Sequence, residues 1–178
     1  MKKEYLLKNV FPYHSAWGAL VAIPYIIIWG LLYYWFFGSN FRLGFVMIFS
    51  ALCFGTCAML IKFLSKDILI WFNDDFIIIK KGNNTQKKYL KKDVLGFYSY
   101  NYETKSTILR KSLIKFKICL QDGQKIYFND SEYKSKYEEV KGEELKKLLD
   151  ALKKELGFKE IRSKKYSNIY WYSNTSIL

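Results

Sequence analysis

Two long apolar stretches dominate the first third of the chain, at residues 16–37 and 43–64. A helix needs about 20 consecutive apolar residues to cross the hydrocarbon core, because lipid cannot hydrogen-bond to exposed backbone groups. Each stretch meets that length, and the turn-forming tripeptide Gly38-Ser39-Asn40 separates them. The pattern therefore predicts a transmembrane helical hairpin over residues 15–64.

The pattern changes after Asp67 to short β-type runs bounded by turn residues. Asp122-Gly123 is the clearest turn, because Asp-Gly tolerates the positive φ that a tight β-turn needs. The predicted strands are 68–72, 76–81, 85–90, 94–100, 113–120 and 125–129.

A single amphipathic helix is predicted over residues 142–157, with Gly157 as its C-terminal stop. Its apolar side consists of Leu145, Leu148, Leu149, Leu152 and Leu156. The fold class is therefore an α-helical transmembrane hairpin followed by an α+β domain of six to seven antiparallel strands. A bent sheet covered by the helix would bury the leucines.

These elements divide the chain into four parts: an N-terminal segment (1–14), the helical hairpin (15–64), the α+β domain (67–158) and a tail (159–178). The tail is unusually aromatic around Tyr170, Trp171 and Tyr172. It can pack on its own domain, add a strand to a partner, or lie on the membrane surface. The first of these is the favoured interpretation.

Charge sets the expected orientation of the hairpin. The chain has a net charge of +13, and most of the excess follows Ser65. Only Arg42 lies in the turn between the two apolar stretches, so the positive-inside rule places both termini in the cytoplasm. A cleaved signal peptide is disfavoured, because the first stretch is long and ends in bulky residues without a small-x-small cleavage site. The flanking cations are Lys2, Lys3, Lys8, Lys62 and Lys66.

Small residues are candidates for helix packing within the membrane. Gly18 with Ala22, and Ala51 with Gly55, have the small-xxx-small spacing that lets helices approach closely. They serve either contact within the hairpin, which is favoured, or a homo-oligomer interface. No charged residue lies at mid-depth, which argues against a transporter or voltage sensor.

The α+β part resembles the bacterial pleckstrin-homology-like domains. The resemblance rests on the order of strands, the single helix after them, and the two runs Phe72-Asn73-Asp74-Asp75-Phe76-Ile77-Ile78-Ile79-Lys80-Lys81-Gly82 and Tyr89-Leu90-Lys91-Lys92-Asp93-Val94. It covers about residues 68–158. The resemblance implies an antiparallel barrel or sandwich capped by the helix, a binding or assembly scaffold and no catalytic residues. With the hairpin, it implies the bacterial cytoplasmic (inner) membrane.

Six lysines form the candidate binding site: Lys80, Lys81, Lys87, Lys88, Lys91 and Lys92. They follow the hairpin closely in sequence, and a lysine close to an anionic leaflet contributes about 1 kcal/mol to attraction. They are interpreted either as a docking surface for anionic lipid or a partner, or as a solvated lysine-rich face.

Candidate catalytic and metal chemistry is sparse. His14 is the only histidine, so a His pair is excluded. Cys53 and Cys57 share a helix face but have no third ligand nearby, and Asp74-Asp75 reads as a turn. We expect no metal, no cofactor, no small-molecule substrate and no enzyme activity. Tyrosines interleave with lysines at Tyr98, Tyr100, Tyr102, Tyr127 and Tyr133, but the charge is spread out and no nucleic acid is expected.

The sequence thus favours a non-enzymatic, membrane-anchored binding or scaffold module that presents a basic domain at the cytoplasmic face. Its expected partners are the lipid bilayer and a protein partner or a second copy of the chain. The alternative is a small membrane immunity or toxin-neutralising protein.

Overall fold

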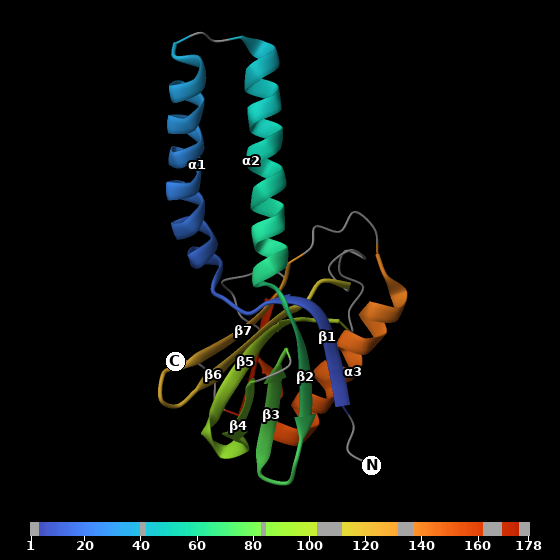
Figure 1. The fold of residues 1–178 in the computed structure, drawn as a ribbon. Helices are drawn as coiled ribbons and strands as arrows, with labels where there is room; N and C mark the ends of the chain where they lie inside the picture. Colours follow the sequence, from blue (N-terminus) through green and yellow to red (C-terminus); the bar gives the residue numbers. More distant parts are fainter. Residues whose placement is uncertain are drawn as a thin grey trace. The chain divides into compact units, whose positions relative to one another are not determined.

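The computed structural model describes residues 4–39, 42–82, 85–102, 112–131, 137–161 and 169–174. The chain forms two compact units (Figure 1). One comprises Tyr13–Leu64, and the other combines Met1–Pro12 with Ser65–Leu178. Each unit is described by itself.

The unit Tyr13–Leu64 is a pair of helices, α1 (Ser15–Phe37) and α2 (Leu43–Leu64). Among the described residues, α2 is the one helix long and apolar enough by length and composition to span a membrane. Within α1, Ala22–Phe37 forms a shorter apolar stretch. Helix α1 ends at Gly38, whose φ of 56° is unfavourable for other residues.

Aromatic rings and one polar contact join the two helices. Phe37 stacks on Phe45 with ring centroids 4.7 Å apart, and Trp29 meets Phe49 edge to face at 5.2 Å. The Tyr25 hydroxyl hydrogen-bonds to Thr56 and also donates to the Cys53 carbonyl at 3.1 Å. Several ring pairs cross between the helices whereas the hydrogen bonds come from one tyrosine hydroxyl, so ring packing is the main contact within the pair.

Nine strands of the described chain form one antiparallel sheet in the order β4-β3-β2-β1-β7-β6-β5-β9-β8. Their bounds are β1 Glu4–Phe11, β2 Lys66–Phe72, β3 Phe76–Lys81, β4 Thr85–Leu90, β5 Val94–Tyr100, β6 Lys115–Leu120, β7 Lys125–Asp130, β8 Lys159–Ile161 and β9 Ile169–Ser173. A short 3-10 helix, Lys91–Asp93, connects β4 to β5. The strands predicted between residues 68 and 129 are all present, and the count of six to seven was too low.

Strand β1 corrects the expected domain borders. Residues 1–14 were expected to be a separate segment, but Glu4–Phe11 lies inside the sheet between β2 and β7. Leu7 and Val10 are buried in the core. The helical hairpin is therefore an insertion between two adjacent strands of one domain, and the domain is not simply appended after it.

Asn9 explains why this strand is hard to recognise in the sequence. It has a φ of 53°, and the pairing of β1 with β2 shifts between Leu7 and Val10. The Asn9 N–H donates to Asp67 Oδ1 at 2.9 Å, and its carbonyl accepts from Ser131 Oγ at 2.5 Å. This bulge turns the end of β1 from β2 towards β7 and breaks the alternation of apolar residues.

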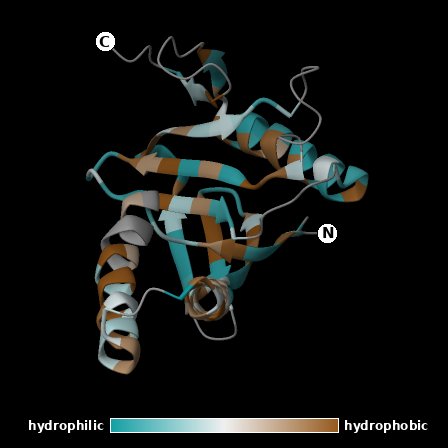
Figure 2. Ribbon diagram, turned by 90° about the horizontal axis from the view of Figure 1, so that it is seen from above, coloured by the Kyte–Doolittle hydropathy of each residue, from teal (hydrophilic) through white to brown (hydrophobic). Residues whose placement is uncertain are grey.

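Helix α3 (Glu139–Leu156) packs on the inner face of the sheet (Figure 1). Hydropathy alternates along the strands and along this helix, as an amphipathic layer requires (Figure 2). The helix starts three residues earlier than predicted and ends at Gly157, which has a φ of 65°. Its fully buried leucines are Leu145, Leu148, Leu149 and Leu152.

The aromatic tail is part of the same sheet. Strand β9 pairs with β5 on one side and with β8 on the other. Tyr172 is fully buried and stacks on Phe97, with ring centroids 4.8 Å apart. The prediction that the tail packs on its own domain is confirmed for residues 169–173.

Candidate functional site

Three lysines lie on the inner face of the sheet, near the start of β2, the end of β3 and the start of β4: Lys66, Lys81 and Lys87, which we call the lysine cluster. Lys66 follows the same side of β2 as the buried Ile68, and Lys81 lies opposite Ile68 on β3. Lys87 lies opposite the buried Ile79 on β4. The lysines are therefore diagonal neighbours on one face of three adjacent strands.

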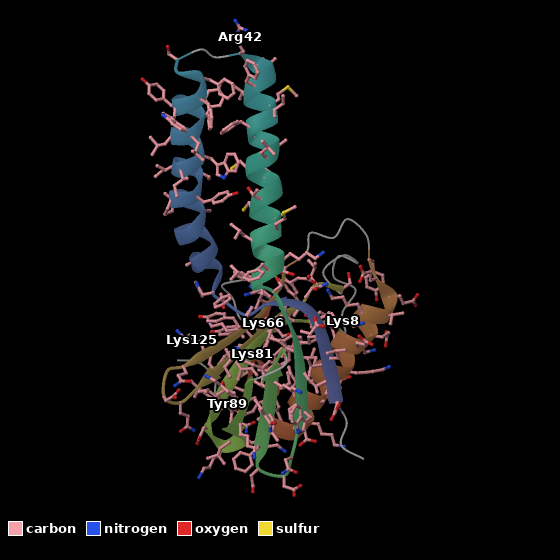
Figure 3. All side chains as sticks on the ribbon, in the orientation of Figure 1. Lys8, Arg42, Lys66, Lys81, Tyr89 and Lys125 are labelled. Atoms are coloured by element: carbon pink, nitrogen blue, oxygen red, sulfur yellow. The ribbon has the colours of Figure 1, made fainter. Side chains whose placement is uncertain are left out.

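The electrostatics of the cluster are unfavourable without an anion. Burial lowers the pKa of Lys81, and the charges of Lys87 and then Lys66 lower it further. Lys66 and Lys81 are labelled on neighbouring strands in Figure 3. Like charges held together at the end of an apolar sheet attract anions, because an anion relieves their mutual repulsion.

The other four candidate lysines are not part of this cluster. Lys80 and Lys88 lie on the opposite face of β3 and β4, opposite Leu69 and Ile78 respectively. Lys91 forms an ion pair with Glu155 of α3, with Nζ and Oε2 2.5 Å apart. Lys92 is exposed in the 3-10 helix beyond the other end of β4. The six lysines thus divide among three locations.

Lys66 is the cluster residue that the candidate set omitted. The strand was predicted to begin at Ile68, whereas β2 begins at Lys66, which pairs with Val10. Extending the two-residue alternation of Ile68 and Ile70 backwards by one step identifies Lys66 as an inward-facing position.

Chain connectivity ties this end of the sheet to the hairpin. Only Pro12, Tyr13 and His14 separate β1 from α1, and only Ser65 separates α2 from β2. At the start of α1, His14 Nδ1 accepts a hydrogen bond from the Ala16 N–H at 3.0 Å and caps the helix. An extended chain gains at most about 3.6 Å per residue, so both connections are short.

On α2, the two small residues proposed for helix packing are exposed and lie away from other described side chains. Ala51 and Gly55 are exposed on α2, and a Cβ added to Gly55 would meet no atom within 4 Å. Ala22 is half-buried on α1. The surroundings of Gly18 lie outside what the structure describes. Aromatic rings take the role expected of these small residues within the pair.

The tyrosines interleaved with lysines do not form one surface. Tyr102 is buried in the core, with its hydroxyl donating to the Leu113 carbonyl at 2.8 Å. Lys117 Nζ lies 4.8 Å from the ring centroid of Tyr98 and 5.9 Å from that of Tyr127, so its charge faces these two rings. Tyr133 lies outside the described residues.

Reactive groups are separated from one another in the part of the chain that the structure describes. No three His, Cys, Asp or Glu side chains among these residues are grouped so as to hold a metal ion. Cys119 is buried, and burial raises the pKa of its thiol, which keeps it protonated and unreactive. Asp74 and Asp75 lie in the exposed turn between β2 and β3, as expected.

We compared the chain with known protein families, curated proteins and solved structures. No protein-family model, no curated protein and no solved structure matches the chain. Any statement of function therefore depends on the residues and geometry described above.

Proposed function

We propose that the protein is a non-enzymatic, membrane-anchored binding module, in which α1 and α2 span the bacterial cytoplasmic membrane and hold the basic α+β domain at its inner face. One observation carries the proposal: the apolar helix pair is inserted between the adjacent strands β1 and β2. Two chain segments then join the domain to the helices, where a terminal anchor would supply only one.

The pleckstrin-homology-like fold is part of this proposal. It is supported by seven consecutive strands, β1 to β7, that precede α3 and occupy adjacent places in the sheet. Strands β8 and β9 then extend the sheet beyond β5. Such a scaffold binds partners through its surface and needs no reactive centre.

Orientation is tested by cysteine labelling in cells. In a variant lacking Cys53, Cys57 and Cys119, we expect Ser39→Cys to react with a membrane-impermeant maleimide in intact cells. Asp74→Cys is expected to react only after permeabilisation, because positive-inside placement puts the domain in the cytoplasm. The opposite labelling pattern, or extraction of the protein by alkaline carbonate, would contradict the proposed anchoring.

The lysine cluster is proposed to contact anionic headgroups of the inner leaflet. Three lysines at about 1 kcal/mol each give about 3 kcal/mol, which corresponds to roughly a hundredfold shift in the docked population. We expect amide hydrogen exchange in β3 and β4 to slow when the full chain is moved from phosphatidylcholine nanodiscs to nanodiscs containing phosphatidylglycerol. Lys81→Gln/Lys87→Gln is expected to abolish most of this difference.

The matched control removes two charges elsewhere on the same unit. Lys92 and Lys147 are exposed on the 3-10 helix and α3, and Lys92→Gln/Lys147→Gln is expected to leave the lipid-dependent slowing within twofold of the unmodified protein. A specific role for the cluster would be refuted if amide exchange were equal in both kinds of nanodisc. It would also be refuted if the two double variants lost the lipid-dependent slowing to the same extent.

A further inference from the structure

A groove of about 540 Å³ lies between β4 and the turn that joins β6 to β7. Its apolar lining comes from Phe76, Leu90 and Leu120, and Tyr89, which is labelled in Figure 3, lines it as well. The groove is separate from the lysine cluster, none of whose members lines it. It lies beside an end of the sheet, because β4 is the first strand in the sheet order.

The strand side of this groove is the free edge of β4. Among the described strands, β4 pairs with β3 alone. The Lys91 N–H donates to the Asp75 carbonyl at 2.8 Å, which continues the β3–β4 ladder by one residue. Alternate residues of an antiparallel strand bond to the same neighbour, so Gln86, Lys88 and Leu90 direct their N–H groups away from β3. Gln86 and Lys88 are exposed, so this edge can accept an added strand.

Hydrogen bonds hold the opposite wall of the groove in place. The Gln121 N–H donates to the Asp93 carbonyl at 2.9 Å, and Gln121 Nε2 donates to the Lys92 carbonyl at 3.0 Å. Asp122 Oδ1 accepts a hydrogen bond from the Gln124 N–H at 2.8 Å. These bonds join the β6–β7 turn to the 3-10 helix that follows β4. A segment that enters the groove therefore meets a preformed wall, which lowers the entropic cost of binding.

Two carboxylates give this wall a local negative charge. Asp93 and Asp122 line the groove, and neither forms an ion pair in the part of the chain that the structure describes. Burial and then the charge of Asp122 raise the pKa of Tyr89, as expected of two residues that line the same groove. The wall therefore attracts a cationic side chain locally, although the net charge of +13 repels cations from the protein as a whole.

The charges of β4 disfavour a second copy of the chain as the occupant. Antiparallel pairing of β4 with its own copy would bring Lys87 and Lys88 close to the same two residues of that copy. Like charges on facing strands are destabilising, and lysines on edge strands prevent self-association in this way. A segment of a different protein, whose cation lies beyond these lysines, avoids the repulsion.

We propose that this groove binds an extended segment of a partner protein, which adds as a strand to β4 and places one lysine or arginine against Asp93 and Asp122. Backbone pairing with Lys88 and Leu90 would supply affinity, and the cation would fix the register of the segment. The inference rests on the proposed binding function, and it names the partner class and its site. It does not depend on membrane orientation or on lipid contact.

The test uses the full chain in phosphatidylcholine nanodiscs, because neutral lipid does not attract a charged peptide. The probe is the fluorescein-labelled peptide Arg-Val-Thr-Val-Thr-Val, followed by fluorescence anisotropy. We expect saturable binding and slower amide hydrogen exchange over residues 86–90. The same peptide N-methylated at every valine and threonine keeps its charge but has no N–H groups there to donate. We expect it to bind at least about tenfold more weakly.

Two substitutions of Lys88 separate the backbone of β4 from its side chain. Lys88→Ala and Lys88→Pro both remove the charge, but only the proline removes the N–H that faces the groove. Proline is tolerated at an outward-facing position of an edge strand, since the hydrogen bonds to β3 remain. We expect the peptide to bind Lys88→Pro about tenfold more weakly than Lys88→Ala. Equal binding by the two variants would contradict pairing with β4.

Asp122 and Asp150 provide a matched pair of charge removals, since both are exposed and only Asp122 lines the groove. Asp122→Asn keeps an oxygen that can accept from the Gln124 N–H. We expect it to weaken peptide binding about fivefold, the upper range for an exposed charge pair, and Asp150→Asn to change binding less than about twofold.

Equal effects of the two aspartate substitutions, equal binding of the N-methylated peptide, or no binding at millimolar peptide would overturn the proposal. These failures leave the labelling and lipid experiments unaffected, so they are distinguishable from a failure of the anchor.

Discussion

A chain in which an Asn-Gly turn replaces residues 12–64 is expected to fold as a soluble domain, whereas residues 65–178 alone are expected not to fold. Val10 pairs with Lys66, so Phe11 on β1 and Ser65, just before β2, are the next residues along the two antiparallel segments. A two-residue Asn-Gly turn suits two antiparallel strands at that point. Residues 65–178 lack β1, which lies between β2 and β7 in the middle of the sheet.

The size of this effect follows from burial. Leu7 is 4% exposed and Val10 is fully buried, and loss of a buried leucine side chain alone costs about 2–5 kcal/mol. Deletion also leaves the edges of β2 and β7 unpaired, and a whole domain is stable by only about 5–15 kcal/mol. We expect a cooperative urea transition for the turn-joined chain and none for residues 65–178. Equal transitions for both would show that β1 is dispensable.

The elements that could be predicted from the sequence are those whose local pattern is unbroken. Most of strands β2 to β7 are rich in branched or aromatic residues, and turns follow at Gly82 and Gly123, both with positive φ in the structure. Helix α3 could be predicted because its leucines repeat at helical spacing and Gly157 ends it. Their ladder order needs contacts between residues far apart in sequence, which local patterns do not encode.

Strand β1 could not be predicted because its evidence is non-local. Its bulge at Asn9 is stabilised by Asp67 and Ser131, which lie 58 and 122 residues away in the chain. Lys2, Lys3 and Lys8 precede an apolar helix, so they were interpreted only as charges that flank a membrane segment and not as part of a strand.

The sequence predicted part of the lysine cluster, because it identified lysines near one another in the chain but not the face of the sheet on which each lies. Counting lysines identified Lys81 and Lys87 but could not separate them from Lys80 and Lys88, which the strand register places on the opposite face. The ion pair of Lys91 with Glu155 depends on how α3 packs on the sheet. Side-chain facing and tertiary ion pairs therefore decide which lysines act together.

Tyr172→Ala is expected to destabilise the sheet domain by about 3–5 kcal/mol, the usual range for removing a large aromatic side chain from a core. Tyr172 is fully buried, and its ring lies nearly parallel to that of Phe97, with an interplanar angle of 14°. Phe158 also stacks on Phe97, with ring centroids 6.3 Å apart. The cavity would therefore open at the junction of β5, β9 and the residue that follows α3.

The conservative variant Tyr172→Phe separates ring packing from the hydroxyl. The hydroxyl donates to Glu160 Oε2 over a long distance of 3.3 Å, so its loss is expected to cost only about 1 kcal/mol. Urea unfolding of the full chain in mild detergent, with amide hydrogen exchange to locate the affected strands, measures both variants. If Tyr172→Ala costs no more than Tyr172→Phe, the tail rests on the surface of the domain. A large difference instead makes β9 a structural strand of the sheet, paired with β5 on one side and with β8 on the other.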